Sequence, residues 1–314
     1  MLCLMALNPL SLLRAFPGSI AQGMIWGIMA LGVYITFRLL DFPDLTVDGS
    51  IATGAAVSVM LIRSGVSPIL SLPVAFLAGM AAGLVTGLLN TLLGIPGILA
   101  SILTQISLYS VNLIIMGKSN QPVSVDNYPL VVSLRYVTES MGSRTVFFIG
   151  MITFLLALVA VLYWYFGTEQ GHAIRATGCN GNMARAQGIN TNFIKVLALM
   201  LSNGLVGLCG GMYAQFQGAA DINMGRGAIV IGLAAVIIGE VLFGKFASKR
   251  RLAFAFTLTA VILGAVIYYM VYQFVLWLKM PSESMKLFSA IVVAVFLAIP
   301  YLKEKRSLRK GVAR

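Results

Sequence analysis

The sequence predicts an all-α polytopic membrane protein with about 8–10 transmembrane helices. Of its 314 residues, 59% are apolar and only 10% are charged, whereas an average soluble domain carries about 25% charged residues. Its 32 glycines suit close helix packing in lipid. This composition excludes a soluble globular enzyme, a disordered chain and a small disulfide-bonded scaffold.

Apolar runs of about 20 residues mark the expected membrane spans. They lie at about 18–40, 69–93, 97–117, 145–167, 194–216, 227–244, 252–278 and 287–302. A further run at 50–62 is too short to cross comfortably and follows an acidic turn. The sequence therefore predicts a broken or re-entrant helix near 41–65, and eight or nine spans in all.

Basic residues predict the orientation of the chain. Thirteen of the 22 Lys and Arg residues lie in three segments, 168–195, 245–251 and 303–314. Two expected helices separate each segment from the next, so all three share one side, which the positive-inside rule makes the cytoplasm. The loops 118–144 and 217–226 then face outward, and the side of the N-terminus stays open. We expect one transmembrane domain, 1–314, with a cytoplasmic loop at 168–192 and a basic cytoplasmic tail at 303–314.

The acidic turn contains the first group of candidate functional residues. Asp41, Asp44 and Asp48 lie with Pro43 and Gly49 between apolar runs. Carboxylates are costly at membrane depth unless they face water or a partner, which favours a broken helix that lines a translocation path. The alternative is a surface loop in which Asp48 caps the next helix. The candidate path residues are Asp44, Thr46, Asp48 and Ser50.

A second polar group lies on the expected helix at 97–117. Thr104, Gln105 and Ser107 follow a tight Gly-Ile-Pro-Gly turn. Since Thr104 and Ser107 are three residues apart, we expect them to share a helix face. A polar stripe on a spanning helix either lines a cavity or forms hydrogen bonds to another helix, and both interpretations remain open.

The loop at 168–192, hereafter the docking loop, is typical of two short helices at about 170–177 and 181–187. Asn180 can cap the second helix and Gly188 can end it. Arg175 and Arg185 lie one on each helix and could pair with acidic groups on a partner, and His172 is a lone surface histidine of the same loop. Two capped helices favour a docking surface for a cytoplasmic partner, and the alternative is a positive-inside anchor.

Small residues and one glutamate predict features of packing. Gly79, Gly83 and Gly87 recur every four residues, a spacing that brings helix backbones close together in lipid. Glu240 lies near the end of an expected span, where we expect it to reach the cytoplasm or to pair with Lys245. The regions 41–65 and 217–232 each join a small-residue helix to a polar interruption, a pattern that an inverted or tandem repeat would produce.

Several classes of function lack their motifs in this sequence. There is no Walker phosphate-binding loop, so energy for transport must come from another subunit or from an ion gradient. Three cysteines and one histidine give no metal-like or redox spacing, so we expect no metal site and no disulfide. The net charge of +12 fits the positive-inside pattern, so we expect no nucleic acid partner.

Three segments resemble the permease family of ATP-binding-cassette (ABC) importers for ribose-type sugars and branched-chain amino acids. Asp44-Leu-Thr-Val-Asp-Gly-Ser50 resembles that family's Asp-Leu-Ser-Val-Gly-Ser element, and the stretch 90–104 is similar to its Asn-Gly…Pro-x-Ile-x-Thr-Leu stretch. The stretch 171–190 resembles its cytoplasmic loop, with matches in order at Arg175, Gly178, Asn180, Ala184, Arg185, Gly188, Ile189 and Asn190. A fourth stretch, 225–244, is similar to the family's late Gly/Ala-rich helix, where the family often has a second glycine at the position of Glu240. The resemblance covers about 40–305.

The resemblance implies a multi-pass protein of the bacterial cell (inner) membrane with a cytoplasmic C-terminus. It implies a second permease copy, cytoplasmic ATP-binding subunits that hold ATP and Mg²⁺, and an extracytoplasmic substrate-binding protein. The chain itself would hold no cofactor and would not be an enzyme. Docking of the ATPase would use His172, Arg175, Asn180, Arg185 and Gly188. The acidic element is most similar to a branch that takes aromatic amino acids such as tryptophan. Alternatives from the residues alone are an ion-coupled secondary transporter, using Asp48 and Glu240, and a membrane-embedded enzyme.

Overall fold

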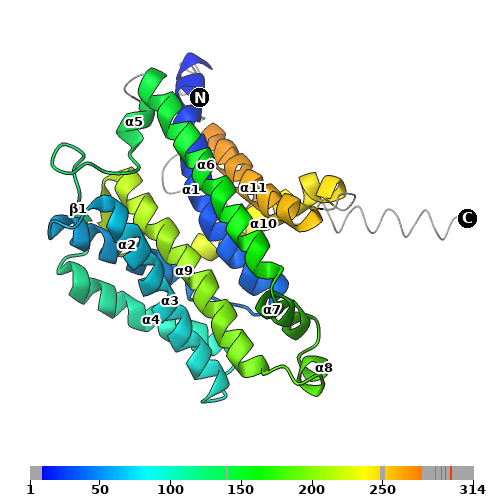
Figure 1. Cartoon of the computed structure of the whole chain (residues 1–314). Helices are drawn as coiled ribbons and strands as arrows, with labels where there is room; N and C mark the ends of the chain where they lie inside the picture. The colour runs from blue at the N-terminus through cyan, green and yellow to red at the C-terminus, as the bar shows by residue number, and fades with distance from the viewer. Residues whose placement is uncertain are drawn as a thin grey trace, which may run out of the picture.

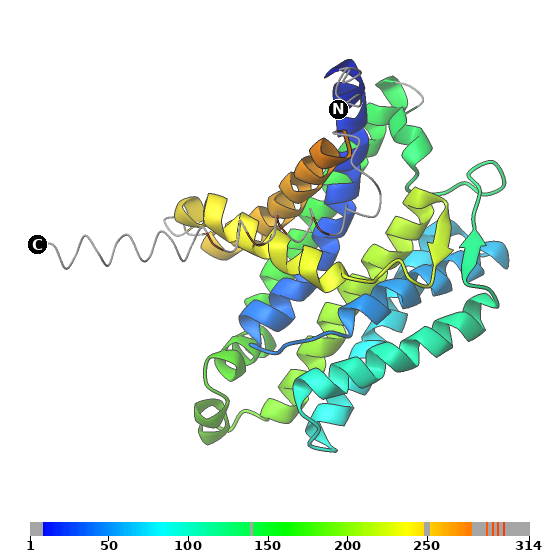
Figure 2. The same cartoon turned by 180° about the vertical axis from the view of Figure 1, so that it is seen from behind.

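A computed structural model describes residues 9–138, 141–247 and 252–277, together with Leu287, Ile291, Ala294 and Ala298. In this described part, six helices are long and apolar enough to cross a membrane, and a shorter apolar helix covers Ala228–Gly244. Figures 1 and 2 show the helices gathered into one tilted bundle. The prediction of an all-α polytopic membrane protein is confirmed.

The elements follow the order that the apolar runs predict. They are α1 (Pro9–Val33), η2 (Tyr34–Leu39, a π-helix), α2 (Val47–Arg63), α3 (Pro68–Thr91), α4 (Gly97–Met116), β1 (Asn120–Pro122), α5 (Leu134–Thr138), α6 (Met141–Phe166), α7 (Glu169–Cys179), α8 (Gly181–Ala186), α9 (Thr191–Gln217), β2 (Ala219–Asp221), α10 (Ala228–Ala247) and α11 (Ala253–Trp277). The expected span at 287–302 lies outside the described residues except at four positions. The chain from 18 to 277 thus contains each expected helix, and α2, with 17 residues, is shorter than a full span.

The glycine ridge of α3 packs against α9. A side chain at Gly79 would overlap the backbone of Asn203, and one at Gly83 would overlap the carbonyl of Leu199. A Cβ at Gly87 would lie 3.0 Å from the Cα of Val196. The residue numbers rise along α3 while they fall along α9, so the two helices are antiparallel. The predicted packing role of these glycines is confirmed.

A second tightly packed group joins α1, α10 and α11. A Cβ at Gly23 would lie 2.6 Å from the Cα of Val266, and a side chain at Gly239 would overlap the carbonyl of Ala260. Glu240 on α10 accepts a hydrogen bond from Arg38 Nε of η2 at 2.9 Å. This cation lies 202 positions away in the sequence, a distance at which sequence offers no signal. The side chain of Lys245, the partner that we expected, lies outside the described residues, so that pairing stays a prediction.

Helices α2 and α10 begin side by side and leave in opposite directions (Figure 2). A side chain at Gly225, just before α10, would overlap the carbonyl of Asp48 in the first turn of α2. From this point α2 runs towards β1, where Arg63 hydrogen-bonds to Gln121. Helix α10 runs instead towards η2, as the Arg38–Glu240 pair shows. Both helices start inside the bundle, at this common point, and we call the pair the half-helices.

The loops separate into two ends of the bundle (Figure 1). At one end β1 pairs antiparallel with β2, which brings 118–138 and 217–226 together as predicted. At the other end the guanidinium of Arg175 on α7 lies 4.1 Å from the ring centroid of Phe254 at the start of α11. The docking loop therefore shares an end with the start of α11. The start of α1 lies at the β1 end, since a Cβ at Gly18 would be 3.6 Å from Leu134 of α5.

Candidate functional site

The chain enters α2 through a buried carboxylate. Asp44 is only 2% exposed, and its Oδ1 accepts a hydrogen bond of 2.9 Å from the backbone N–H of Thr46. Its Oδ2 accepts a second bond of 2.7 Å from Nδ2 of Asn203 on α9. Hydrogen bonds to both oxygens offset part of the cost of burying this group. Asp44 is thus tied into the bundle, whereas Asp41 and Pro43 earlier in the turn are exposed.

The same buried network joins four more of the polar residues around α2. Ser50 donates a hydrogen bond of 2.6 Å to Oδ1 of Asn203, so one amide bridges Ser50 and Asp44. The hydroxyls of Thr46 and Thr86 lie 2.7 Å apart, and Thr86 donates to Thr104 at 2.9 Å. These contacts connect α2, α3, α4 and α9 within the membrane-spanning part of the fold.

Asp48 binds the first turn of the other half-helix. Its two carboxylate oxygens accept hydrogen bonds of 2.9 Å from the backbone N–H groups of Gly227 and Ile229. Thr46 is the N-cap of α2, without a side-chain cap bond. We expected Asp48 as a possible cap of the helix that follows it, α2, and that prediction was wrong. Asp48 instead caps α10, whose first turn lies 179 residues further along the chain.

The polar residues of α4 do not share one environment. Thr104 is buried in the network described above, whereas Ser107 is exposed and bonds only to the carbonyl of Leu103 among the described residues. Thr104 and Ser107 are three residues apart on α4, so they are neighbours on its surface as predicted, but the edge of the packed surface falls between them. Gln105 is half-buried, and its Cα would lie 3.3 Å from a Cβ at Gly49 of α2.

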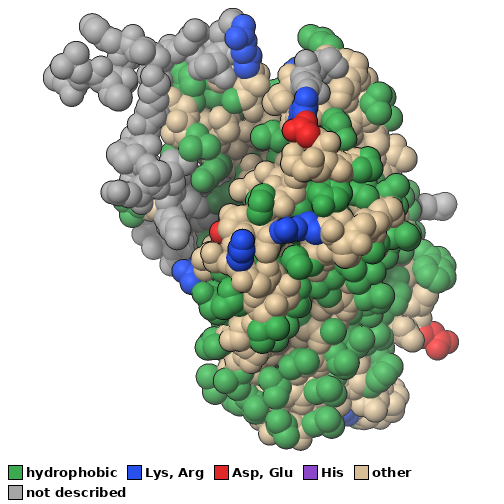
Figure 3. All heavy atoms as spheres, turned by 90° about the vertical axis from the view of Figure 1, so that its left-hand side faces the viewer, with side chains coloured by type: hydrophobic (Ala, Val, Ile, Leu, Met, Phe, Trp, Pro, Cys, Tyr) green, Lys and Arg blue, Asp and Glu red, His purple; other side chains and the backbone are tan. Residues whose placement is uncertain are grey.

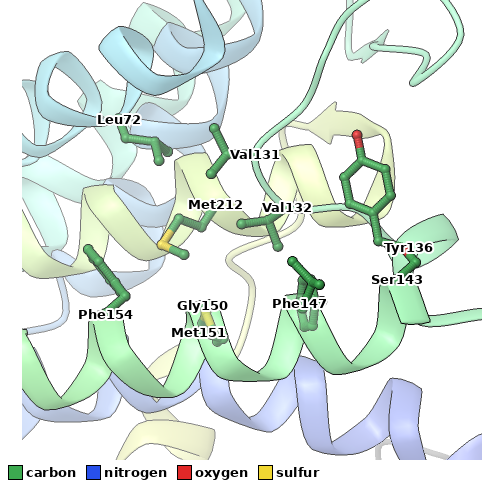
Figure 4. A pocket seen from close by; sticks show the side chains of 11 residues that line it. Leu72, Val131, Val132, Tyr136, Ser143, Phe147, Gly150, Met151, Phe154 and Met212 are labelled. Atoms are coloured by element: carbon green, nitrogen blue, oxygen red, sulfur yellow. The ribbon is translucent and has the colours of Figure 1, made fainter. Parts of the chain in front are cut away.

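A cavity of about 570 Å³ separates α6 from α3 and α9. Figure 4 shows Phe147 and Phe154 of α6 facing Leu72 of α3 and Met212 of α9, with Val132 above them. Its lining is almost wholly apolar. A zwitterionic solute needs polar or charged groups that converge on it, so this cavity does not suit a polar substrate.

The docking loop folds as its caps predict. Helix α7 covers Glu169–Cys179 and α8 covers Gly181–Ala186. Oδ1 of Asn180 accepts hydrogen bonds from the backbone N–H groups of Asn182 and Met183. Gly188 follows with φ of +84°, a left-handed conformation that glycine adopts without strain and that ends the helix.

The three charged or titratable candidates of this loop differ in their surroundings. Arg185 is exposed, and its Nε donates a hydrogen bond of 2.6 Å to Thr191. His172 is exposed beside an open depression of about 630 Å³ between α7 and the start of α9. Arg175 instead turns inward onto the rings of Phe166 and Phe254. The structure thus presents Arg185 and His172 at the surface, and Arg175 towards the bundle.

Two network residues were not among the sequence candidates. Asn203 and Thr86 lie inside apolar spans and bind the α2 region from α9 and α3. Their signal in the sequence is a polar side chain within an apolar run. That signal could have marked both residues as candidates, but it could not predict their partners. Asp44, the partner of Asn203, lies 159 residues away.

Comparisons with known proteins place the chain in a family. Residues 17–300 match the family described as branched-chain amino acid transport system / permease component. The chain is 40% identical over 277 residues to a tyrosine transport system permease protein of Clostridioides difficile, which covers 88% of each chain. It is 29% identical over 231 residues to the inner membrane ABC transporter permease protein YjfF of Escherichia coli, covering 73% of this chain and 65% of that one.

A more distant relative is a probable branched-chain amino acid transport permease protein, LivH, of Methanocaldococcus jannaschii. It is 25% identical over 213 residues, which cover 64% of this chain and 65% of that protein. No solved structure matches the chain significantly. The comparisons give no support to the ion-coupled alternative. The family match covers nearly the whole chain, and the membrane spans of the structure are those that such a permease needs. The chain therefore belongs to the branched-chain amino acid-type permease family and is a multi-pass membrane permease subunit of the ABC importer class.

Proposed function

We propose that this permease passes an aromatic amino acid, and tyrosine in particular, into the cell. The single observation that carries the proposal is the 40% identity to the tyrosine transport system permease of C. difficile over most of both chains. The acidic element before α2, which resembles an aromatic amino acid branch of the family, supports the same substrate class.

The proposed energy source is a separate ATPase that binds ATP and Mg²⁺ and docks on α7 and α8. Support comes from the exposed side of this loop, where Arg185 and His172 reach the surface and Met183 is 63% exposed. Asn180 and Gly188 hold the two helices in place. A guanidinium beside an exposed apolar side chain suits a protein partner with a carboxylate near an apolar patch.

The proposed translocation path lies between this chain and a second copy, along the outer face of α4. Among the described residues, α4 packs mainly against α2 and α3, which leaves its other side uncovered. Ser107 is exposed there and Gln105 is half-buried. Asp44, Thr46, Ser50 and Thr104 would hold α2 rigidly behind the path, and Asp48 would hold α10 to α2. Figure 3 shows the β1 side of the molecule, where hydrophobic side chains dominate and charges are few.

The proposed orientation places the docking loop and the C-terminal tail in the cytoplasm of the cell that carries the permease. The pattern of basic segments in the sequence supports it, and the docking loop shares one end of the bundle with the start of α11. An extracytoplasmic binding protein would then deliver the solute at the opposite end, where β1 and β2 lie.

Reconstituted vesicles test the proposal. The permease is co-purified with its ATPase, placed in vesicles with ATP inside, and given the binding protein with radiolabelled tyrosine outside. We expect uptake that requires ATP and that unlabelled tryptophan or phenylalanine reduces more than leucine does. Uptake driven by an ion gradient without ATP would overturn the ATP-driven mechanism. Transport of leucine or ribose, but not of tyrosine, would overturn the substrate.

Charge reversal tests the docking face. We expect Arg185→Glu to leave folded yield unchanged and to reduce both the co-purified ATPase and tyrosine uptake, because attraction becomes repulsion at the contact. Lys118→Glu is the matched control, since Lys118 is also exposed but lies at the β1 end. Equal ATPase recovery from both variants would mean that Arg185 only anchors the loop.

A further inference from the structure

One cluster joins four helical elements at the docking-loop end of the bundle. The ring of Phe254 on α11 lies 5.4 Å from that of Phe166 on α6 and 6.4 Å from that of Tyr34 on η2, between centroids. The guanidinium of Arg175 on α7 lies 4.1 Å from the centroid of Phe254 and 5.6 Å from that of Phe166. We call these four residues the aromatic junction.

In the part of the chain that the structure describes, the side chain of Arg175 is held in this junction by aromatic rings and not by hydrogen bonds at its Nε. Its Nε is buried and has no hydrogen-bond partner among the described residues. Arg175 is half-buried, so part of its guanidinium gives up water, and aromatic faces stabilise a cation more strongly where water is excluded. Arg185, one helix later, keeps its polar partners and its exposure. The two arginines of the docking loop therefore do different work.

Backbone contacts make the junction stiff. A side chain at Gly178 near the end of α7 would overlap the carbonyl of Leu39, the last residue of η2. A side chain at Gly171 would overlap the backbone of Phe166 at the end of α6. Helix α7 thus lies directly on the ends of η2 and α6, so a displacement of α7 has to move these ends or break the contacts.

The end of η2 is connected to both α2 and α10. The chain passes through a short segment from Leu39 to Asp44, which binds Asn203. Arg38 of η2 binds Glu240 of α10. A movement of η2 therefore reaches both half-helices, the first through the chain before α2 and the second through an ion pair.

We propose that Arg175 is a positioning residue that ties α7 to α6 and α11 through the aromatic junction and so couples the ATPase to the bundle, without binding the ATPase itself. This inference rests on the proposed function, because it needs a docked ATPase. Arg175 differs in this from Arg185, which the resemblance groups with it as a docking residue.

Two substitutions test the junction. Arg175→Met keeps a long side chain but removes the cation, and Phe254→Leu removes the ring. We expect both to retain the parent amount of co-purified ATPase and its basal turnover. Substrate-stimulated hydrolysis and tyrosine uptake should fall by roughly five- to tenfold, the population shift that loss of a contact of this class produces. Arg175→Lys should be intermediate, because an ammonium ion stacks less well on a ring.

The double variant separates coupling from general damage. If Arg175 and Phe254 act through one contact, the double variant should couple no worse than either single variant. Additive losses would overturn the proposal, as would normal coupling in Arg175→Met. Loss of the ATPase from Arg175→Met to the extent seen for Arg185→Glu would make Arg175 a docking residue and also overturn it. Failure of the parent permease to bind any ATPase would instead reject the proposed function itself.

Discussion

Helices α3 and α6 are both long apolar spans that contain glycines, yet they are packed in opposite ways. Gly79 and Gly83 of α3 touch the backbone of α9, and in the described part of the chain nothing lies within 4 Å of a Cβ built at Gly142 or Gly150 of α6. Only 22% of the most apolar stretch of α6 is buried, against 33% of that of α3 and 61% of that of α9, the partner of α3. An apolar cavity further separates α6 from α3 and α9.

The difference shows that the spacing of small residues decides which spans form the rigid core. Glycines every four residues along α3 make a continuous groove for a neighbouring backbone. The stretch between Gly142 and Gly150 carries Val146 and Phe147 instead, and bulky side chains keep a neighbour at a distance. The rigid part, α2 with α3 and α9, also holds the buried polar network, whereas α6 connects the two ends of the bundle.

The largest expected effect is at Gly83. Gly83→Leu would drive a side chain into the backbone of Leu199, and neither helix can yield without loss of the contacts along the ridge. We expect a loss of about 3 kcal/mol of unfolding free energy, or no folded protein. Unfolding by SDS titration in mixed micelles measures it. Stability equal to that of the parent would mean that this face of α3 meets lipid.

The second prediction concerns Asp44 and Asn203. Asp44→Asn should lower the free energy of unfolding by about 2 kcal/mol. The new side chain would place an NH2 group where Oδ2 now accepts, so that it would face the Nδ2 donor of Asn203. The exchange Asp44→Asn with Asn203→Asp restores one donor and one acceptor, although Leu199 loses its bond from Nδ2. We expect the exchange to recover part of the stability in the same titration. No recovery would show that the carboxylate is needed at position 44 for another reason.

The third prediction concerns the contact between the half-helices. Asp48→Ala removes the acceptor for two backbone N–H groups at the start of α10, and we expect a cost of about 1 kcal/mol. Asp48→Asn should cost less, because an amide oxygen can still accept one of these bonds. Uptake and membrane abundance are measured together. Loss of uptake in Asp48→Asn at parent stability would show that the negative charge itself serves transport.

The smallest expected effect is at Gly150. Gly150→Leu adds the same side chain as Gly83→Leu, but in open space, so we expect a change within about 0.5 kcal/mol. This pair of variants is the direct test of the comparison between α3 and α6. A large loss at Gly150 would show that a partner covers this part of α6 in the assembled transporter.

What the sequence predicted well were features with local signals. The spans follow from apolar runs, and the two helices of the docking loop follow from Asn180 and Gly188, which act within a few residues. The partners of Asp48 and Glu240 could not be predicted, because they lie 179 and 202 positions away and depend on how helices cross. The inward orientation of Arg175 could not be predicted for the same reason, because its partner Phe254 belongs to a span far away in the sequence.

The contact between α2 and α9 has a consequence for the order of events during synthesis. Gly54 packs on Gly207, and Ser50 binds Asn203, so partners 153 residues apart must meet. Chains are synthesised at about 5–20 residues per second, so roughly 10–30 s pass between the synthesis of α2 and that of its partner residues on α9. During that time its 17 residues are too few to span and its polar side chains have no α9 to bind. Membrane insertion of this segment is therefore completed late, by a helix from the second half of the chain.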